Sequence, residues 1–286
     1  MPESQSNTVP ILLMIGAIFC FSSMDAVAKS AMEIMPPAQA IWARYISQAV
    51  IVTLIVIPRF NQLARTGYPK LQLMRSIALM GATTLFFLGI SQISLAEATA
   101  VMDVNLVLIT LGAFLFLGER IGIRRIIGVA VSLVGALIII RPGAGVFSIY
   151  ALMPLGAAVC YTAYSLATRF VGRDESPWTS LFYSALVGAL CFSAYIAFHW
   201  VPLSGEALIL MALMGLFGTL GQLLLIRALT LGEASLIAPF AYTGLIWAAL
   251  YGIFLFGDYP DAWTILGAAV IVAGGLYVWI RERQTR

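Results

Sequence analysis

The sequence predicts an all-α polytopic membrane protein with ten transmembrane helices arranged as two inverted five-helix repeats. Three observations lead to this prediction. Of the 286 residues, 61% are hydrophobic and 10% are charged, which exceeds the apolar content of a soluble domain. Apolar runs of about 20 residues, long enough to cross a bilayer, follow one another along the chain. The second half also repeats residue types of the first half at a nearly constant separation, which indicates an internal duplication.

Apolar runs between polar breaks predict the ten helices in order. They cover residues 9–28, 38–58, 76–95, 98–118, 126–140, 147–168, 178–200, 206–226, 234–256 and 262–280. The polar start of the chain, residues 1–9, contains no Lys or Arg and lacks the charged region of a signal peptide, so the first helix is expected to stay in the mature chain. The fifth helix is the shortest, and Arg125 and Arg141 at its ends can extend to the membrane surface.

The fourth and ninth helices are each preceded by a capping box. Ser94 and Glu97 stand before the fourth helix, and Thr230 and Glu233 stand before the ninth. In such a box the two side chains bond to backbone N–H groups that the first helical turn leaves unpaired. We therefore interpret these two carboxylates as helix starts rather than as a binding site.

The duplication divides the chain into a first repeat at residues 9–141 and a second repeat at residues 147–280. Matching residues are separated by 136 to 140 positions and include Gly16 with Gly156, Cys20 with Cys160, Thr83 with Thr219, Glu97 with Glu233, and Gly128 with Gly267. Because each repeat holds five helices, an odd number, the second copy enters the membrane from the opposite side. Inverted repeats of this kind are typical of transporters whose halves rock about a site between them.

The basic residues predict the orientation in the membrane. With a cytoplasmic N-terminus, thirteen of the sixteen Lys and Arg residues fall in cytoplasmic segments, among them Arg75 in the segment 59–75. Lys29 and Arg141 fall outside, and Arg44 lies within the second helix. An excess of positive charge marks the cytoplasmic side. We therefore expect a multi-pass protein of the cell inner membrane with both termini in the cytoplasm.

Composition and motifs exclude several classes of protein. The net charge of +3 is small and scattered, which argues against nucleic-acid binding. No polar stretch is long enough for a soluble domain, and the chain has no Walker sequence, HExxH or GxSxG. The three cysteines have no metal-ligand or disulfide spacing, so neither a metal nor another cofactor is expected. Glycines such as Gly128 and Gly135 are spaced as in closely packed membrane helices.

Each repeat carries a series of short segments in a fixed order. They are Leu117-Gly118-Glu119-Arg120, Gly128 and Gly135 in the first repeat, and Ala238-Pro239-Phe240-Ala241-Tyr242, Phe256-Gly257-Asp258, Gly267, Gly274 and Gly275 in the second. These segments resemble the EamA-like transporters of the drug/metabolite transporter superfamily, and the resemblance covers about residues 9–280. It implies a ten-helix inverted-repeat transporter with a central cavity, which moves small organic solutes such as amino acids, nucleosides or vitamins.

Part of the second repeat narrows this resemblance, and two positions depart from it. The stretch from Ala238 to Asp258 is most similar to members that carry S-adenosylmethionine or riboflavin. Asn105 stands where many relatives have proline, and Asp258 stands where the first repeat has Glu119. Both departures are expected to alter the details of gating, so the substrate of any one relative does not carry over to this chain.

Three ionisable residues lie inside predicted helices, where a charge costs about 2.5–3.5 kcal/mol at the helix centre. Counted from the outer surface, Asp25 lies about 6 Å deep, Arg44 about 9 Å and Asp103 about 8 Å. The functional interpretation is a cluster that faces a cavity, in which Asp25 and Arg44 serve the outer gate or the coupling of transport to protons. The alternative is that Asp25 pairs with Lys29 one turn away while Arg44 extends to the lipid headgroups.

Five side chains are predicted to contact a solute. Asp103 has no basic residue three or four positions away, so it needs a partner from another helix or from water, and Asn105 lies close to it in sequence. Tyr242 and Trp247 straddle the midplane on the ninth helix, where transporter sites usually lie. Tyr164 on the sixth helix can present its ring and hydroxyl group in the same way. The alternative for the three aromatic residues is packing between helices or contact with lipid.

Together these observations predict a secondary transporter that works by alternating access. Carboxylates and aromatic rings without a second buried cation favour a zwitterionic or cationic small organic solute. Import and export share this machinery, as do proton coupling, exchange and uniport. The alternatives are an intramembrane enzyme, for which no clustered nucleophile or metal-ligand set is visible, and a non-transporting membrane receptor subunit.

Overall fold

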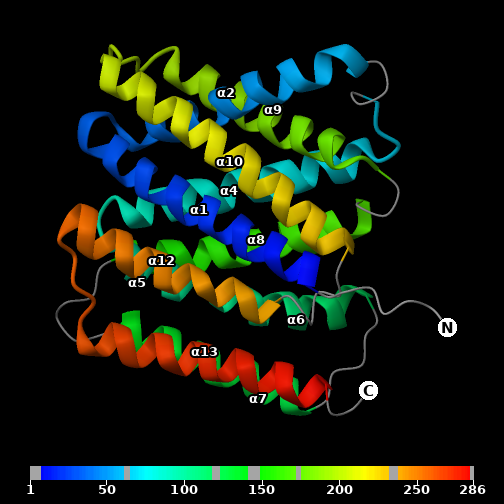
Figure 1. Ribbon diagram of the computed structural model, residues 1–286, viewed down its shortest axis with the longest axis vertical. Coiled ribbons are helices and arrows are strands. Elements are labelled where there is room, and N and C mark those ends of the chain that lie inside the picture. The colour runs from blue at the N-terminus through cyan, green and yellow to red at the C-terminus, as the bar shows by residue number, and fades with distance from the viewer. Residues whose placement is uncertain are drawn as a thin grey trace.

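The computed structural model describes residues 8–60, 65–117, 123–140, 149–171, 175–231 and 238–283. Over these residues the chain forms helices joined by short connections and contains no strand. The helices run across the view in Figure 1 and are stacked along its long axis. Helix α1 (Thr8–Ile34) begins, and helix α13 (Ala262–Arg283) ends, on the same side of that view.

The elements between these two helices follow in chain order. They are α2 (Pro37–Val56), η1 (Ile57–Arg59), α4 (Pro69–Ile90), α5 (Leu95–Met102), α6 (Val104–Leu117), α7 (Ile123–Ile140), η2 (Ile149–Ala151), α8 (Leu152–Val171), α9 (Pro177–Ile196), α10 (Gly205–Leu231), η3 (Ala238–Tyr242), α12 (Thr243–Tyr251) and η4 (Gly252–Phe256). Here η1, η2 and η3 are 3₁₀ turns and η4 is a π-helical turn.

Proline opens three of these helices, because its fixed backbone angle and missing N–H suit the first helical turn. Pro37, Pro69 and Pro177 occupy this place in α2, α4 and α9. Helix α4 therefore begins at Pro69, and the predicted range of 76–95 was wrong at both ends. The sequence predicts Arg75 in a polar segment outside the helices, whereas in the structure Arg75 is a buried residue of α4.

Six described helices are long and apolar enough to cross a membrane. They are Thr8–Ile34, Pro37–Arg59, Pro69–Ile90, Ile149–Val171, Pro177–Ile196 and Gly205–Leu231, and Phe240–Phe256 and Ala262–Tyr277 are shorter apolar helices. Large apolar side chains remain on the outside of the bundle, including Leu54, Leu190, Ile209 and Phe254, each more than 60% exposed. Such a surface requires lipid around it, so the chain is a multi-pass membrane protein.

Two of the predicted helices are irregular. The span predicted at 98–118 is divided at Asp103 into α5 and α6, and the Leu106 N–H donates to the Asp103 carbonyl over 3.1 Å, a bond of 3₁₀ type. The span predicted at 234–256 is described from residue 238 and passes from η3 through α12 to η4. Asp103 and Tyr242 are 139 positions apart, which falls within the separation of the matching repeat residues.

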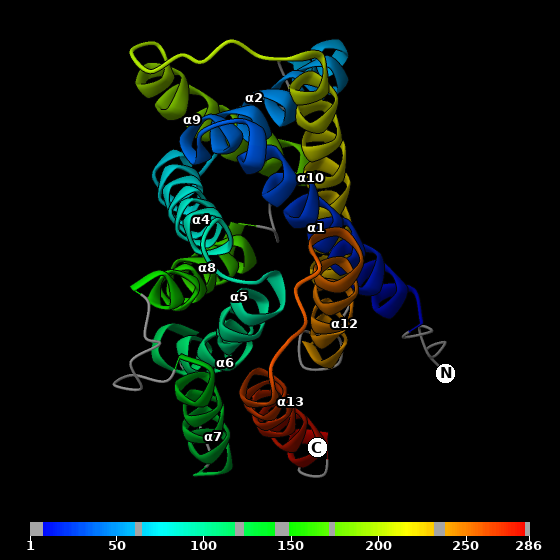
Figure 2. The same ribbon diagram turned by 90° about the vertical axis from the view of Figure 1, so that its left-hand side faces the viewer.

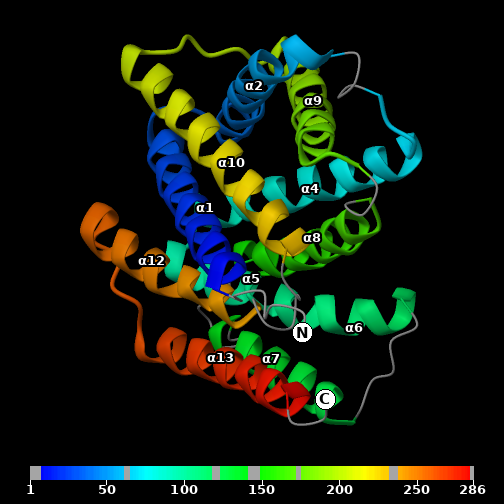
Figure 3. The same ribbon diagram turned by 45° about the vertical axis from the view of Figure 1, so that its right-hand side comes forward.

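The helices pack in a pattern that relates the two halves of the chain. Helix α1 packs against α10, and α8 packs against α4; α10 also contacts α2, and α4 contacts α9. The pairs α2 with α9 and α7 with α13 complete the set. Figure 2 shows α4, α8 and α5 on one side of the molecule and α10, α1 and α12 on the other, and Figure 3 shows α7 lying along α13.

Small residues allow the closest of these approaches. A Cβ atom added to Gly135 of α7 would lie 2.8 Å from the Gly267 carbonyl oxygen of α13, and one added to Gly267 would lie 2.7 Å from the Gly135 oxygen. The two backbones therefore touch, as the glycine spacing predicted. At Gly275 of α13, an added Cβ would collide with the Tyr242 ring and hydroxyl group, so Tyr242 rests on the α13 backbone.

Candidate functional site

The break between α5 and α6 places two polar side chains inside the protein. Asp103 and Asn105 are 8% and 5% exposed. The Asn105 amide nitrogen donates to the Met102 carbonyl over 2.6 Å, which satisfies one of the carbonyls that the break leaves free. One Asp103 carboxylate oxygen (Oδ2) and the Asn105 amide oxygen are buried without a hydrogen-bond partner. Such atoms are costly unless something else contacts them.

Tyr242 brings a third unpaired atom to this place from the other half of the chain. It ends the 3₁₀ turn η3 just before α12, and its buried hydroxyl group has no partner. Its ring packs in one cluster with Ala100, Val101 and Val104, the residues around the break, and its hydroxyl group lies within electrostatic reach of Asp103. We call Asp103, Asn105 and Tyr242 the helix-break cluster.

Asp25 and Arg44 lie near each other on α1 and α2. Arg44 is 2% exposed, and its Nε donates to the Met24 sulfur over 3.3 Å. Its Nη1 is buried without a partner. Asp25 is within electrostatic reach of Arg44, but the two charges do not form an ion pair. Counted along the helices to the ends at Ile34 and Pro37, Asp25 lies about 14 Å deep and Arg44 about 11 Å.

The structure contradicts the alternative interpretation, in which Asp25 and Arg44 serve only the membrane surface. The alternative paired Asp25 with Lys29, but the Lys29 ammonium group binds Asp258 instead. Arg44 does not extend to the surface either, since its side chain is buried against the Tyr45 ring, with 4.6 Å from the guanidinium carbon to the ring centroid. Both charges therefore face the interior of the bundle.

Helix α8 lies between the charged pair and the helix-break cluster. The Thr162 hydroxyl group is 3.5 Å from the Asn105 carbonyl oxygen. The neighbouring Tyr161 lies within electrostatic reach of Asp25, and its hydroxyl group has no hydrogen-bond partner in the described part of the chain. Asp25 and Tyr161 are both half-buried.

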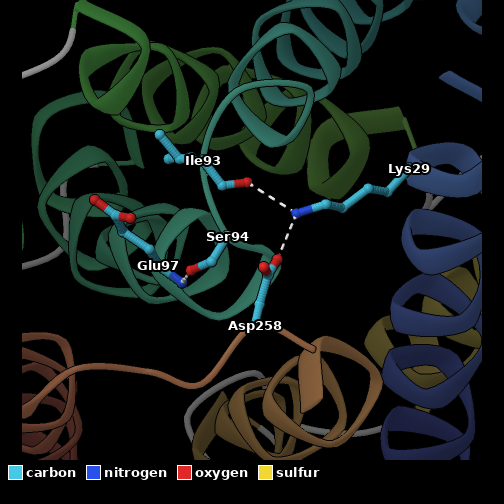
Figure 4. A network of polar contacts seen from close by, with 5 residues as sticks. All are labelled: Lys29, Ile93, Ser94, Glu97 and Asp258. Atoms are coloured by element: carbon cyan, nitrogen blue, oxygen red, sulfur yellow. Dashed lines mark hydrogen bonds and ion pairs between the residues drawn. The ribbon is translucent and has the colours of Figure 1, made fainter. Parts of the chain in front are cut away.

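One end of the bundle is held by a contact that the sequence did not predict. The Lys29 ammonium group of α1 is 2.8 Å from an Asp258 carboxylate oxygen and 3.1 Å from the Ile93 carbonyl oxygen (Figure 4). It also lies over the Phe256 ring. Beside it, Ser94 caps α5 by accepting from the Glu97 N–H over 3.2 Å, as the capping box predicted. We call the contact of Lys29, Ile93 and Asp258 the Lys29 bridge.

The opposite end holds a buried polar network centred on Arg75. Arg75 is fully buried, and it donates to the Thr168 hydroxyl group over 2.7 Å, to the Ser180 carbonyl over 2.9 Å and to the Gln72 amide oxygen over 3.0 Å. Gln72 in turn donates to a Glu175 carboxylate oxygen over 2.6 Å. The Arg75 guanidinium group is thus linked to the Glu175 carboxylate through the Gln72 amide. Arg75 is a second buried cation beside Arg44, so the prediction that there is none was wrong.

Tyr164 belongs to this network. Its hydroxyl group accepts from Arg75 over 3.3 Å and from the Gln222 amide over 3.0 Å. Gln222 also accepts from Gln48 over 2.7 Å, so the network joins α4, α8, α10 and α2. The hydrogen bonds of Tyr164 therefore hold helices together. Its ring is 1% exposed and packs against Tyr161 and the Arg75 guanidinium group.

Trp247 has a different setting. It packs edge-on against Phe19 with 5.0 Å between ring centroids, and Phe19 is 38% exposed. At about 100° per residue, five positions place Trp247 about 140° around the helix from Tyr242. The two aromatic residues therefore project from different faces of the same span. Glu119 and Glu233 lie outside the described residues.

Comparisons with known proteins agree with this architecture. The model of the EamA-like transporter family matches residues 8–141 and again residues 148–280. The pseudopaline exporter of Pseudomonas aeruginosa is 31% identical over 269 residues, covering 92% of this chain and 93% of that protein. The riboflavin transporter of Rhizobium johnstonii is 30% identical over 290 residues, covering 99% and 94%. The S-adenosylmethionine uptake transporter of Rickettsia bellii is 25% identical over 264 residues, covering 92% and 90%.

A solved crystal structure shares the fold. It superposes with a TM-score of 0.71 at 20% identity and covers 98% of this chain and 99% of the other. The two matches of the family model together span most of the sequence, and the similar relatives are named as transporters or exporters. The chain belongs to the EamA-like transporter family.

Proposed function

We propose that this protein is a secondary transporter that moves a small organic metabolite across the inner membrane by alternating access. In this proposal the two five-helix repeats are inverted and move against each other about a central site. Asp103, Asn105, Tyr242, Trp247 and Tyr164 contact the solute. The solute is zwitterionic or cationic, and Asp25 and Arg44 act at the gate or in coupling. Both termini lie in the cytoplasm.

The packing pattern supports the inverted repeats. If α1, α2, α4 and α7 are exchanged with α8, α9, α10 and α13, the contact of α1 with α10 becomes that of α8 with α4, and the contact of α2 with α10 becomes that of α9 with α4. The pairs α2 with α9 and α7 with α13 map onto themselves. α1 begins and α13 ends on one side of the molecule (Figure 1), as the proposed location of both termini requires.

The helix-break cluster is the observation that carries the proposal. The α5–α6 span of the first half and the η3–α12 span of the second half become irregular at matching positions. Three buried polar atoms there have no partner, one each from Asp103, Asn105 and Tyr242. Broken helices at the repeat interface are the usual construction of a transporter site, because their free backbone groups and polar side chains can bind a solute. A solute that contacts Asp103, Asn105 and Tyr242 would remove the cost of leaving these atoms unpaired.

The Lys29 bridge supports a gate at one end of the bundle. It ties α1 to both the connection before α5 and the connection after η4, and it lies about one helical turn beyond Asp25. Because it joins the first half of the chain to Asp258 in the second half, the bridge would have to break when the two halves separate at that end. The charges of Asp25 and Arg44 lie directly beneath it.

Flux measurements in proteoliposomes test this proposal. The purified protein is offered amino acids, nucleosides, riboflavin, S-adenosylmethionine and simple anions, each with and without a pH gradient. We expect saturable flux of at least one zwitterionic or cationic compound, and we expect Asp103→Asn to reduce that flux about tenfold or more, because it replaces a charged contact. Glu33→Gln, which neutralises an exposed carboxylate on α1, is the matched control and should transport normally.

Two results would contradict the proposal. Flux of simple anions alone would refute the expected solute class. Unchanged flux in Asp103→Asn, both with and without the pH gradient, would remove Asp103 from the solute site. A pH gradient that leaves the wild-type flux unchanged would favour exchange or uniport over proton coupling.

A further inference from the structure

Two opposite charges inside the bundle face each other without touching. The Asp25 carboxylate makes no hydrogen bond or ion pair within the described residues, and Arg44 Nη1 is buried with no partner. The two side chains therefore do not form an ion pair with each other. The bond from Arg44 Nε to Met24 nevertheless holds the guanidinium group beside the residue that precedes Asp25.

Neighbouring side chains hold the Arg44 guanidinium group in place. The Arg44 guanidinium group lies over the Tyr45 ring, and the Tyr45 hydroxyl group donates to Thr83 of α4 over 3.1 Å. A Cβ atom added to Gly218 of α10 would lie 3.1 Å from the Met24 sulfur. Arg44 is thus held by Met24 of α1 and Tyr45 of α2, while its Nη1 has no partner.

A buried charge without a partner, such as that of Arg44, is destabilising. A ligand that carries charges of both signs at short separation would satisfy Asp25 and Arg44 together. An ammonium group would bind the Asp25 carboxylate, and a carboxylate would bind the planar guanidinium group through charge-assisted hydrogen bonds. The half-buried Tyr161 hydroxyl group, within electrostatic reach of Asp25, offers a further polar contact.

We propose that Asp25 and Arg44 form a two-point receptor for the ammonium and carboxylate groups of an α-amino acid, whether free or as the head of a larger metabolite. This inference rests on the proposed transport function and specifies its substrate class. The head group sits between α1 and α2, beneath the Lys29 bridge, and the rest of the solute extends past Tyr161 toward the helix-break cluster. Binding neutralises both charges, so the site can close over the solute.

Binding to the purified full-length protein tests the receptor with matched probes. The probes are the twenty standard amino acids and S-adenosylmethionine, together with the N-acetyl and methyl-ester forms of each compound that binds. Blocking either group removes one charge while keeping the side chain. We expect at least one zwitterionic probe to raise the thermal unfolding temperature and both of its blocked forms to bind about tenfold to a hundredfold more weakly, because each loses a charged hydrogen bond.

Variants then assign the two halves of the receptor. Arg44→Gln should weaken the zwitterion about tenfold to a hundredfold and should bind the methyl ester as the wild type does, because the ester lacks the carboxylate that Arg44 holds. Asp25→Asn should also weaken the zwitterion, and it should bind the N-acetyl form as the wild type does, because that form lacks the ammonium group that Asp25 holds. Arg44→Lys and Asp25→Glu keep the charges and should recover part of the affinity. Arg59→Gln and Glu33→Gln, at exposed positions on the same two segments, are the controls.

The outcomes separate this inference from the proposed function. If blocked probes bind as well as the zwitterion, or if saturable flux occurs only for compounds without an α-ammonium carboxylate, the receptor is refuted and the transport proposal stands. If no compound of the flux panel crosses the membrane in proteoliposomes, the proposed function itself fails. If Arg44→Gln and Asp25→Asn lower binding of all three probe forms equally, the two residues support the fold and do not read the head group.

Discussion

The ammonium group of Lys29 lies 2.8 Å from the carboxylate of Asp258, which joins residues separated by nearly the whole chain. Asp258 is held in place by its own backbone. Its N–H donates to the Gly252 carbonyl over 2.9 Å across the π-helical turn η4, and Gly257 before it adopts a left-handed conformation with φ of 67°. The Asp258 carboxylate therefore reaches Lys29 from a connection whose shape only glycine adopts at low cost.

Removing this ion pair should favour opening of that end of the bundle. We expect Lys29→Gln and Asp258→Asn each to increase opening about threefold to tenfold, since a partly exposed ion pair contributes roughly 1 kcal/mol. The measurement is the labelling rate of a cysteine at Ser22, about one turn deeper than Asp25, by a membrane-impermeant thiol reagent in a cysteine-free background. The double variant should label no faster than either single variant, because both remove the same contact.

Charge reversal provides the control for this prediction. The pair Lys29→Asp with Asp258→Lys should restore part of the slow labelling, and Glu33→Gln on the same helix should not change it. Equal labelling rates in the wild type and both single variants would show that the bridge does not hold the gate.

Tyr242 and Tyr164 should respond differently to loss of the hydroxyl group. Tyr242→Phe removes a buried oxygen that has no protein partner, so the unfolding temperature should stay the same or rise while flux falls. Tyr164→Phe removes the acceptor of Arg75 and Gln222 and should cost about 1–3 kcal/mol of stability. Thermal unfolding and flux are measured on the same preparations. A destabilised Tyr242→Phe variant with normal flux would mean that this hydroxyl group serves the fold.

Arg75 should be essential for folding. Arg75→Gln leaves the Ser180 carbonyl and the Tyr164 and Thr168 hydroxyl groups with one partner fewer, and we expect a loss of about 3 kcal/mol or more. Arg75→Lys should rescue little, because an ammonium group cannot reproduce the directions of the guanidinium N–H groups. The readout is the midpoint of thermal unfolding in detergent, with the exposed Arg65→Gln as control. A midpoint within error of wild type for Arg75→Gln would disprove this role.

The contact between α7 and α13 should not tolerate a single methyl group. Gly135→Ala and Gly267→Ala each place a carbon atom under 3.0 Å from a backbone oxygen, so the helices must move apart at a cost of about 1–3 kcal/mol. Gly205→Ala is the control, because nothing lies within 4 Å of an added Cβ there. Its stability should be unchanged or slightly higher. Equal unfolding temperatures for all three variants would contradict this prediction.

The helical fold was predictable from the sequence because the bilayer imposes it. Long apolar runs must form helices where water is absent, so the approximate positions of α1, α2, α9 and α10 could be read from hydropathy alone. The start of α4 could not be predicted in this way. In the sequence, Gln72 and Arg75 look like part of a polar loop. They are buried because partners from α8 and α9, about a hundred positions away in sequence, bond to them.

The candidate site was predictable in its residue types and not in its partners. Asp25, Arg44 and Asp103 stood out because a charge in a membrane helix is costly wherever it lies. The spacing of residues could not show which carboxylate Lys29 binds. Asp25 lies one turn away, but sequence alone does not reveal that the distant Asp258 comes close to Lys29 in the fold. Tyr161 and Tyr164 also look alike in sequence. In the structure the Tyr164 hydroxyl group bonds to Arg75 and Gln222, whereas Tyr161 lies near Asp25.

The contact of Tyr242 with Gly275 joins a buried side chain to the helix pair α7 and α13. No room for even a methyl group separates the Tyr242 ring from the α13 backbone, and Gly267 of the same helix lies against the α7 backbone. The position of Tyr242 is therefore tied by direct contact to that of α13, and through Gly267 to that of α7.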